Sequence, residues 1–370
     1  MINIIHSVSI MNRAGQETLL MNLFRQIDKE NFSFSFLCSL PYKGEYDDEI
    51  LSLNGKIHHL KKDHLGSNDF FKYFSFVYDN YKFFCSNRQY NVLHIHNYHS
   101  FTSFLQILGA KAAGVKNIIL HSHNSSAPHK YLHYIFRLIL KLFRVEKFAC
   151  SLEAAKWMYG SCKGVKIIKN GIISKDFIFN KTNRKLIRTE FNIRDSEILI
   201  GHIGRFNYQK NHTFLIDIFK ELLDVQNNVK LCLVGEGELE ESIKQKIKSL
   251  NIENKIIFAG IRSDIVNIYS AFDVFLFPSL FEGLPLVLVE AQANGLPCVI
   301  SNTISPEAEL TKCINKVSLN SSLQNWVNNV LQAASAGRLS TYDDIVSNGY
   351  DIITSKNELE KLYKNISHIS

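Results

Sequence analysis

The chain has 370 residues, too many for one ordinary hydrophobic core and enough for two α/β domains of roughly 170 residues each. Hydrophobic residues make up 46% and charged residues 21%, with only 6 prolines, which excludes a long disordered tail. The formal net charge of +7 suits a phosphate-bearing small molecule, an anionic lipid or a nucleic acid equally well, so the position of the cations must decide.

The 7 cysteines are scattered, without a Cys-x-x-Cys pair or accompanying histidine spacing, which argues against a structural zinc site or a disulfide framework. The N-terminus leads directly into the apolar segment Ile2 to Ile5, with no basic region or cleavage site before it. No uncharged run approaches the roughly 20 residues needed to span a bilayer. We therefore expect a cytoplasmic protein.

Short apolar runs alternate with amphipathic helical patterns almost from end to end, which predicts parallel sheets joined by crossover helices. The first half is expected to form one Rossmann-like domain over residues 1–172. Its predicted strands lie near 2–8, 32–38, 56–61, 91–97, 117–123, 146–151 and 165–169. Its predicted helices lie near 15–28, 67–86, 101–114, 130–145 and 153–160.

A turn at Asn170-Gly171 and the polar stretch 174–196 predict a hinge, after which the alternation resumes. A second Rossmann-like domain is expected over 173–345. Its predicted strands lie near 198–204, 230–235, 255–259, 273–277 and 297–301, and its helices near 212–225, 238–251, 263–272, 286–295 and 322–334.

The segment 346–370 is expected to contain a C-terminal helix, near 355–366, that packs back on the N-terminal domain. The predicted fold class is therefore α/β, with two Rossmann-like domains that face each other across a cleft. Parallel sheets of this kind bind ligands at the carboxyl ends of their strands, where helix N-termini supply free N–H groups.

The segment FEGLPLVLVEAQANG, residues 281–295, is the most informative of the sequence. Glu282 and Glu290 flank a Gly-Leu-Pro turn, in which Pro285 suits a helix start. Backbone N–H groups there could hold a diphosphate, while Glu290 accepts ribose hydroxyls and Glu282 bonds a donor-sugar hydroxyl. The alternative is a capped helix with two solvated acids. The residues expected to contact such a sugar nucleotide, which would act as the donor of the sugar, are Glu282, Gly283, Leu284, Pro285, Leu286, Val287 and Glu290.

This segment resembles the Glu-x7-Glu signature of the family 4 glycosyltransferases, and the likeness extends over essentially the whole chain. The resemblance implies a retaining enzyme of GT-B fold, of the type that builds bacterial capsule, O-antigen or exopolysaccharide. It makes the C-terminal half the donor-binding domain. On a weaker likeness, it makes the N-terminal half the acceptor-binding domain.

The first predicted strand of the second half ends in GRFNYQKN, residues 204–211, which places Arg205 and Lys210 on one loop. An Arg fork and a Lys point charge can stabilise a departing diphosphate without a divalent ion. The resemblance assigns this pair to the donor diphosphate; the alternative is two surface cations. No Asp-x-Asp motif follows a strand, and Asp343-Asp344 is interpreted as a solvated loop, so neither a metal nor another cofactor is expected.

Three glycine-containing turns give weaker evidence about the site than the two segments above. In FAGIRSD, residues 258–264, the resemblance implies that the backbone around Ile261 and Arg262 frames the nucleotide base. LVGEGELEE, residues 233–241, is interpreted as architecture, because Gly-x-Gly turns are common in α/β proteins. Gly15 resembles the second glycine of the family's Gly-Gly-x-Glu turn and is expected to contact the donor. Ala14 stands in place of the first glycine, so the backbone is expected to approach the donor phosphate less closely. Glu17 is expected to serve the helix dipole.

The segment IILHSHNSS, residues 118–126, ends a buried strand with His121, His123 and Asn124 directed toward the expected cleft. The resemblance implies a histidine near the donor sugar and the acceptor, and His123 is preferred because it ends the strand. A packed histidine is the alternative for both and is preferred for His121. Metal binding by the two together lacks a third ligand at recognisable spacing. The predicted catalytic residues are Glu282, His123, Arg205 and Lys210.

The segment HKYLHYIFRLILKLFRVEK, residues 129–147, is both apolar and basic. Lys130, Arg137, Lys141 and Arg144 recur at helical spacing and are expected to form one cationic stripe. Such a helix can lie in a membrane interface with its cations on anionic headgroups, and it would then serve the acceptor together with His121 and Asn124. The alternative is a core-packed helix with a basic solvent side. No RNA-reading motif is present, so no nucleic-acid partner is expected.

We therefore expect transfer of a hexosyl or N-acetylhexosaminyl group from a nucleotide sugar, with UDP as the first choice. The expected acceptor is a lipid-linked oligosaccharide or surface polysaccharide at the inner face of the cytoplasmic membrane. Two alternatives stay open: a sugar-nucleotide epimerase or hydrolase of the same fold, and an inert membrane-associated binding subunit. A dehydrogenase fits poorly, because no Gly-x-Gly-x-x-Gly follows the first strand.

Overall fold

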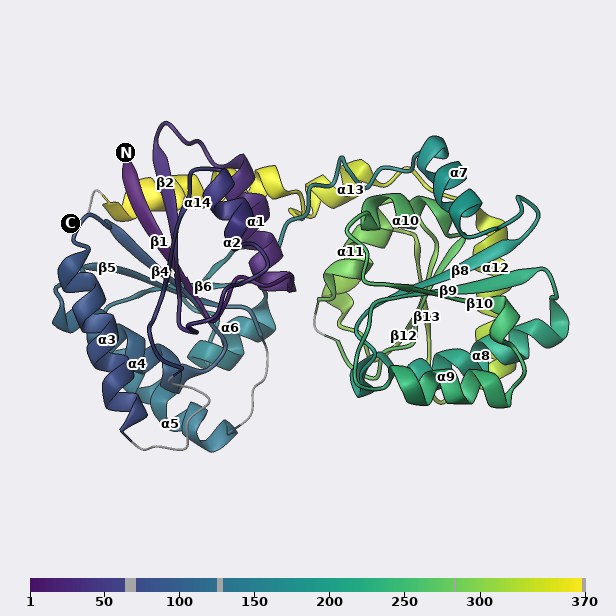
Figure 1. Cartoon of the computed structure of the whole chain (residues 1–370), viewed down its shortest axis with the longest axis horizontal. Helices are drawn as coiled ribbons and strands as arrows, with labels where there is room; N and C mark the ends of the chain where they lie inside the picture. Colours follow the sequence, from purple (N-terminus) through teal and green to yellow (C-terminus); the bar gives the residue numbers. More distant parts are fainter. Residues whose placement is uncertain (64–70, 125–128, 283, 368–370) are drawn as a thin grey trace. The chain divides into compact units, whose positions relative to one another are not determined.

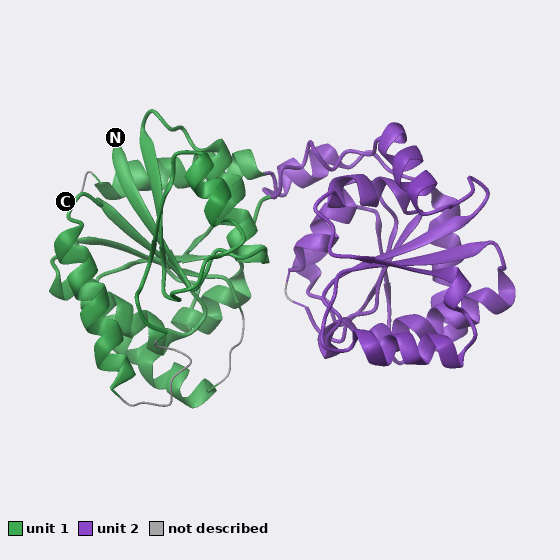
Figure 2. Cartoon of the chain, viewed as in Figure 1, with its two compact units in different colours: residues 1–171, 352–370 green, residues 172–351 purple. Residues whose placement is uncertain are grey.

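The computed structural model describes residues 1–63, 71–124, 129–282 and 284–367 (Figure 1). The chain divides into two compact units (Figure 2). Unit 1 comprises residues 1–171 and 352–370, and unit 2 comprises residues 172–351. The predicted α/β class with two Rossmann-like parallel sheets is confirmed.

In the part of unit 1 that the structure describes, the sheet has seven strands in the order β3-β2-β1-β4-β5-β6-β7, and all pairings are parallel. Its strands are β1 (Ile2–Val8), β2 (Phe32–Cys38), β3 (Lys56–His59), β4 (Val92–Asn97), β5 (Asn117–Ser122), β6 (Glu146–Ala149) and β7 (Lys166–Ile167). Its helices are α1 (Gly15–Gln26), α2 (Asp47–Ser52), α3 (Lys72–Ser86), α4 (Ser100–Ala112), α5 (Lys130–Ile139) with the 3-10 turn η1 (Leu140–Leu142), α6 (Leu152–Tyr159) and α14 (Ile352–Ser367).

The sheet of unit 2, over its described residues, has six parallel strands in the order β10-β9-β8-β11-β12-β13. Its strands are β8 (Ile198–Ile203), β9 (Val229–Val234), β10 (Ile256–Gly260), β11 (Val274–Phe277), β12 (Cys298–Ser301) and β13 (Ile314–Val317). Its helices are α7 (Lys181–Glu190), α8 (His212–Val225), α9 (Glu240–Ser249), α10 (Ile265–Ala271), α11 (Leu286–Ala293), α12 (Leu323–Ala336) and α13 (Tyr342–Ser347), with the 3-10 turns η2 (Tyr208–Lys210), η3 (Glu253–Lys255) and η4 (Pro306–Ala308).

The strand order of each sheet reverses once. In unit 1 the chain runs from β1 outward through β2 and β3, then returns to place β4 on the other side of β1. Unit 2 does the same at β8 and β11. Ligands of doubly wound sheets bind at this reversal, because the connections on either side leave in opposite directions and open a crevice at the strand ends.

The packing of α10 onto the sheet of unit 2 depends on a glycine in β8. A Cβ atom on Gly201, in the middle of β8, would overlap the ring of Phe272 at the end of α10. Both residues lie in a core in which Phe275 and Leu288 are also fully buried. Glycine is therefore required at this position to let the end of α10 pack onto the central strand.

The C-terminal helix α14 belongs to unit 1. Tyr363 is fully buried, and its hydroxyl is 2.7 Å from Nδ1 of His94 in β4. Leu359 on the same helix is 2% exposed. The final turns of the chain therefore complete the core of the first unit, although unit 2 separates them in the sequence.

Several elements depart from the sequence prediction: α2 and β13 were not predicted, and three others differ from the structure. The polar stretch expected to be a hinge contains α7, because the Asn180 side chain accepts hydrogen bonds from Thr182 N and Asn183 N and caps the helix. Asp343 and Asp344 lie in the first turn of α13 rather than in a loop, where acidic groups favour the helix dipole. The helix expected over 130–145 ends at residue 139 and continues as the 3-10 turn η1.

Replacing Leu359 by alanine should destabilise unit 1 by about 2–4 kcal/mol, because the change leaves a cavity beneath α14. Hydrogen exchange followed by mass spectrometry should show faster exchange in β1 and β4. Exchange in β8 and β11 should not change. The matched control is Ile353→Ala on the same helix, where the isoleucine is 44% exposed. Equal acceleration in both units would contradict the assignment of α14 to unit 1.

Candidate functional site

The loop after β8 and the turn after β11 are joined by hydrogen bonds in unit 2. The backbone N–H of Leu280 donates to the carbonyl of Gln209 at 2.9 Å. The side-chain amide of Gln209 donates to the carbonyl of Phe281 at 3.0 Å. Two motifs separated by about 70 positions in the sequence are therefore held at one end of the sheet, since β8 and β11 are neighbours.

Lys210 and Glu282 meet at this junction. Lys210 Nζ lies 2.6 Å from Glu282 Oε1, and their side chains are only 14% and 8% exposed. The same ammonium group lies 4.6 Å from the centroid of the Phe277 ring. Breaking a buried ion pair by removing one partner leaves an uncompensated charge, so each side chain holds the other in place. The structure thus brings two predicted catalytic residues into direct contact.

Arg205 pairs with a different carboxylate. Its Nε lies 3.2 Å from Glu238 Oε2, and both side chains are exposed, at 72% and 56%. A Cβ atom on Gly235 would overlap the carbonyl of Gly204, which means that the Gly-x-Gly turn packs directly on the Arg205 loop. An exposed pair of this kind contributes about 0–1 kcal/mol, so Arg205 can leave Glu238 at little cost. Sequence reasoning missed Glu238.

The side chains of Glu290 and Tyr269 are hydrogen-bonded to each other. The Tyr269 hydroxyl lies 2.9 Å from Glu290 Oε2 and 2.9 Å from the carbonyl of Val287. Burial raises the pKa of Glu290 to about 7. The hydroxyl carries one proton, which it can donate to the Glu290 carboxyl oxygen or to the Val287 carbonyl. Tyr269 on α10 was not predicted, because nothing in its local sequence indicates that it lies beneath α11.

The start of α11 provides free backbone donors. Pro285 precedes the helix with an extended backbone, ψ 118°, and its carbonyl accepts from Leu288 N at 3.0 Å. The helix therefore begins at Leu286, where the predicted helix over 286–295 begins. The N–H groups of Leu286 and Val287 occupy the first turn, where an α-helix leaves its donors without intrahelical partners. Leu284 packs against the core of unit 2. Gly283 lies outside the described residues.

Arg262 has its side chain fully engaged. Nη1 lies 2.5 Å from Glu190 Oε1 on α7, and Nε lies 2.7 Å from Asp264 Oδ1. These hydrogen bonds to Asp264 and Glu190 raise the pKa of the guanidinium above its usual range. Of the predicted base-framing pair, Arg262 therefore offers its backbone rather than its side chain, and Ile261 is 63% exposed.

Gly15 begins α1 in unit 1. It is exposed, and Ala14 before it is extended, with φ −123°. Glu17 lies in the first turn of α1, as the dipole interpretation requires, but burial raises its pKa.

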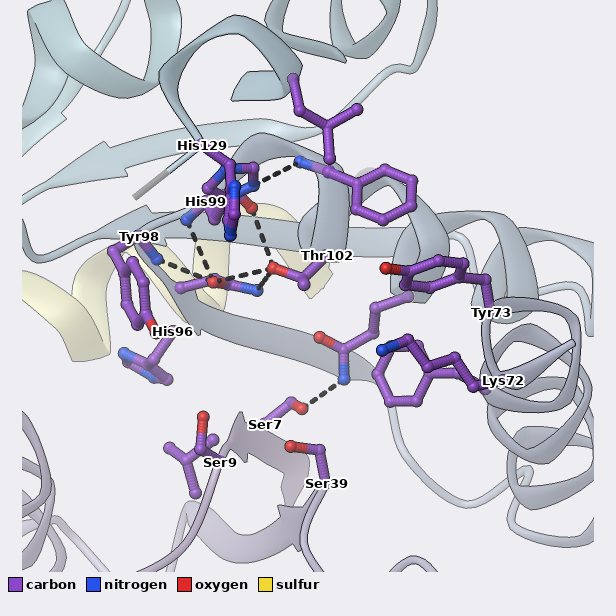
Figure 3. A pocket seen from close by; sticks show the side chains of 16 residues that line it. Ser7, Ser9, Ser39, Lys72, Tyr73, His96, Tyr98, His99, Thr102 and His129 are labelled. Atoms are coloured by element: carbon purple, nitrogen blue, oxygen red, sulfur yellow. Dashed lines mark hydrogen bonds between the residues drawn. The ribbon is translucent and has the colours of Figure 1, made fainter. Parts of the chain in front are cut away.

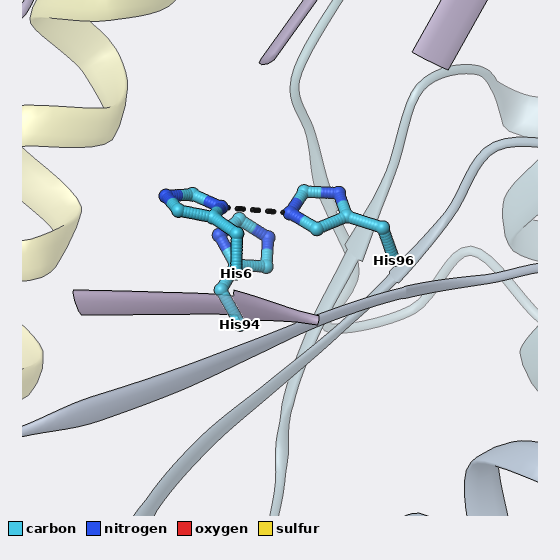
Figure 4. Close-up of side chains that lie close together, drawn as sticks. All are labelled: His6, His94 and His96. Carbon is cyan, nitrogen blue, oxygen red and sulfur yellow. Dashed lines mark hydrogen bonds between the residues drawn. The ribbon is translucent and has the colours of Figure 1, made fainter. Parts of the chain in front are cut away.

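Five histidines from three adjacent strands stack within the sheet of unit 1. They are His6 on β1, His94 and His96 on β4, and His121 and His123 at the end of β5. His96 shares hydrogen bonds of 2.9 Å with both His6 and His123 (Figure 4 shows the first). His94 Nε2 lies 3.2 Å from His121 Nδ1. His121 is 1% exposed, so the packed alternative describes it, whereas His123 is only partly buried.

Burial keeps this cluster neutral. It lowers the pKa of His123 to about 3, and that of His6 to about 3. Sequence reasoning missed His6, His94 and His96, although the alternation LHIHN in β4 places His94 and His96 on one face of the strand.

A cavity of about 330 Å³ opens beside His96, where the strand order of unit 1 reverses (Figure 3). Ser7, Val8 and Ser9 line it from the end of β1, and Asn97 and Tyr98 from the end of β4. Hydroxyl groups and aromatic rings converge in it, from Ser7, Ser9, Ser39, Tyr73, Tyr98 and Thr102. None of these residues was predicted. Asn124, a predicted acceptor residue, is exposed and follows the end of β5.

The predicted cationic stripe on residues 130–145 is interrupted at Arg137. Arg137 is partly buried and donates to the carbonyls of Lys156 and Trp157 at 3.4 and 3.3 Å. Arg144 follows η1 and is exposed. Lys130 and Lys141 remain exposed. Large apolar side chains on the same segment are also exposed, at 88% for Tyr131, 57% for Ile135, 60% for Leu138 and 83% for Leu142.

Among the described residues, no helix combines the length and the apolar character needed to cross a bilayer.

The raised pKa of Glu290 predicts a pH-dependent stability. The folded state holds this proton at a pKa of about 7, against an ordinary value of 4.5, so the carboxyl lowers stability as the pH rises between these values. The free energy of unfolding, measured in urea, should fall as the pH rises from about 5 to about 8. The fall should be roughly 2 kcal/mol smaller for Glu290→Gln than for the unaltered protein, because glutamine has no proton to lose. If the unfolding free energies of the two proteins changed with pH in the same way, ionisation of Glu290 would not affect stability, and the prediction would be contradicted.

The chain was compared with known proteins. Residues 183–318 match the family described as glycosyl transferases group 1. A putative glycosyltransferase, EpsF, of Bacillus subtilis strain 168 is 32% identical over 347 residues, which is 90% of this chain and 88% of that protein. The UDP-Gal:alpha-D-GlcNAc-diphosphoundecaprenol alpha-1,3-galactosyltransferase of Escherichia coli is 27% identical over 58% of each chain.

Among solved structures, the crystal structure of Anabaena Alr3699/HepE in complex with UDP-glucose superposes with a TM-score of 0.77 at 17% identity, over 99% of this chain and 100% of that chain. This likeness confirms the predicted GT-B class. The relatives give no support to an epimerase, a hydrolase or an inert subunit. The chain therefore belongs to the group 1 glycosyl transferases, the GT4-type family that its Glu-x7-Glu segment predicted.

Proposed function

We propose that this glycosyltransferase moves a hexosyl or N-acetylhexosaminyl group, with retention, from a UDP-sugar to a lipid-linked or surface saccharide. The observation that carries the proposal is the buried Lys210–Glu282 pair beside the first turn of α11. Two relatives support the substrates: HepE was crystallised with UDP-glucose, and the galactosyltransferase of E. coli has a diphosphoundecaprenol-linked acceptor in its name.

The donor diphosphate is proposed to lie against the start of α11. An ammonium group carries three N–H donors, and Glu282 occupies one of those of Lys210, which leaves the others for phosphate oxygens. The free N–H groups of Leu286 and Val287 add the positive end of the helix dipole. Arg205 can swing from Glu238 to the charge that develops on the departing diphosphate. Four sources of positive potential make a divalent ion unnecessary.

The two glutamates are proposed to hold the rest of the donor. The second carboxylate oxygen of Glu282 can accept a hydroxyl of the sugar while the first stays on Lys210. Glu290 lies one helix turn further along α11 and is proposed to accept the ribose hydroxyls. Ribose binding requires its carboxylate form, so donor binding and loss of the Glu290 proton are linked.

The acceptor is proposed to enter the cavity beside His96, since its hydroxyl groups and aromatic rings are the groups that bind saccharides in proteins. His123, with a pKa of about 3, is a weak base and is suited to hydrogen bonding rather than to removing a proton. The bond from the sugar to the diphosphate breaks as the acceptor oxygen bonds to the same carbon. The acceptor proton then passes to the leaving phosphate oxygen.

The apolar face of α5 is proposed to dock on the cytoplasmic membrane surface. Tyr131, Leu138 and Leu142 are more than half exposed, and Lys130 and Lys141 flank them. An exposed apolar face bordered by lysines suits the interface of an anionic bilayer. Membrane docking would bring unit 1, with its cavity, to a lipid-linked acceptor.

Calorimetric titration with UDP in excess EDTA should show binding to the unaltered protein. Lys210→Ala should lower the transfer rate about 100-fold, because it removes a donor to the leaving group. Arg205→Ala should lower the rate without changing the fold, since its side chain is exposed. The control is Lys244→Ala on α9, an exposed cation paired with Glu240. A requirement for Mg²⁺ or Mn²⁺ in UDP binding would contradict the proposed metal independence.

Replacing Leu138 and Leu142 together by glutamate should abolish sedimentation of the protein with phosphatidylglycerol vesicles. The substitution places two anions on the face proposed to enter the interface. Leu186→Glu on α7 of unit 2 is the matched control, because that leucine is also 60% exposed. Unaltered sedimentation of the double variant would remove α5 from the docking surface.

A further inference from the structure

Three of the clustered histidines are arranged as metal ligands. His96 on β4 lies directly opposite His121 on β5, and His123 follows on the same side of the sheet. One ring nitrogen from each lies within 4.8 Å of those of the other two. The spacing of His121 and His123 in the sequence offers only two ligands. The parallel pairing of β4 with β5 supplies the third.

His121 is deeply buried and has one ring nitrogen without a partner in the part of the chain that the structure describes. Its Nε2 has no hydrogen-bond partner among the described residues, and the residue is 1% exposed. A buried ring nitrogen without a partner is unfavourable unless something occupies its lone pair. His96 lines the cavity, so an ion and a water molecule can reach the cluster from that side.

We propose that His96, His121 and His123 bind a divalent transition metal ion, with Zn²⁺ as the best match, and with water from the cavity as the fourth ligand. Three imidazoles and an open position are a known zinc arrangement, and nitrogen ligands favour Zn²⁺, Ni²⁺ or Cu²⁺ over Mg²⁺ or Ca²⁺. Nothing in the proposed transfer reaction requires this ion.

The ligand nitrogens, now within 4.8 Å of one another, must move to the spacing of a coordination site. In a tetrahedral zinc site, ligand nitrogens lie about 3.3 Å apart, as Zn–N distances of about 2.0–2.1 Å require. His96 Nδ1 and His123 Nε2 are now 2.9 Å apart, joined by a hydrogen bond that the ion would replace. Each neutral imidazole keeps one proton on the nitrogen that does not bind, so coordination changes tautomers without releasing protons.

A second group, His6, His94 and His96, also meets the distance condition (Figure 4). All three of its members are buried, at 0%, 1% and 6% exposure. The two groups share His96, which therefore allows one ion rather than two. His123 is only partly buried, so the outer group is the accessible one.

Metal binding would engage the nitrogen of His123 that faces its neighbours. If His123 contacts the sugar and the acceptor, which rests on the proposed function, the ion would inhibit transfer reversibly. The site would then be an inhibitory zinc site for saccharide transfer, and a chelator would restore activity.

The test is a calorimetric titration of the full-length, untagged protein with ZnCl₂ after removal of metals by EDTA. We expect one equivalent bound, and a visible absorption band of tetrahedral nitrogen coordination when CoCl₂ replaces zinc. His96→Gln and His123→Gln should each weaken binding at least about 10-fold, the range for loss of a ligand or its support. His58→Gln is the control, since His58 bonds Tyr90 outside the cluster.

Three outcomes would overturn the proposal. They are no saturable binding, equal loss in His58→Gln, or loss in His6→Gln with none in His123→Gln, which would move the site to the inner group. Circular dichroism of each metal-free variant separates loss of ligand from loss of fold. UDP titration in EDTA reports the donor site alone, so failure of the metal site and failure of the proposed transfer are distinguishable.

Discussion

The reversal of strand order in each parallel sheet is the constraint on which the chemistry of this chain depends. At β1 and β4, and again at β8 and β11, neighbouring strands send their connections away in opposite directions. The space left at their carboxyl ends holds the cavity in one unit and the Lys210–Glu282 junction in the other. Residues far apart in sequence meet there because the hydrogen-bonded sheet brings their strands together.

Burial then determines the charge of the groups gathered at these ends. Glu290 and His123 both lose charge through desolvation, the acid by a raised pKa and the imidazole by a lowered one. Lys210 and Glu282 instead lie 2.6 Å apart as a buried pair. Carrying an acid of this kind reduces stability at neutral pH, and such losses are typical of sites shaped by function rather than by folding.

The sequence predicted the elements well where apolar periodicity is strong, as in β8, α8 and β9, and the Glu-x7-Glu segment indicated the turn before α11. It could not predict contacts made across strands or helices. The histidine cluster depends on the register of β4 against β5. Arg137 bonds the end of α6, and Arg262 is engaged by Glu190 on α7. Local spacing gives no access to such partners.

The return of α14 to the first unit has a consequence for synthesis. A ribosome completes every residue of unit 2 before it makes the helix that carries Leu359 and Tyr363. The first half of the nascent chain therefore waits with an uncovered apolar surface over β1 and β4 while the second half folds. Premature termination near the end would release a protein whose unit 2 is intact and whose unit 1 is exposed to proteolysis.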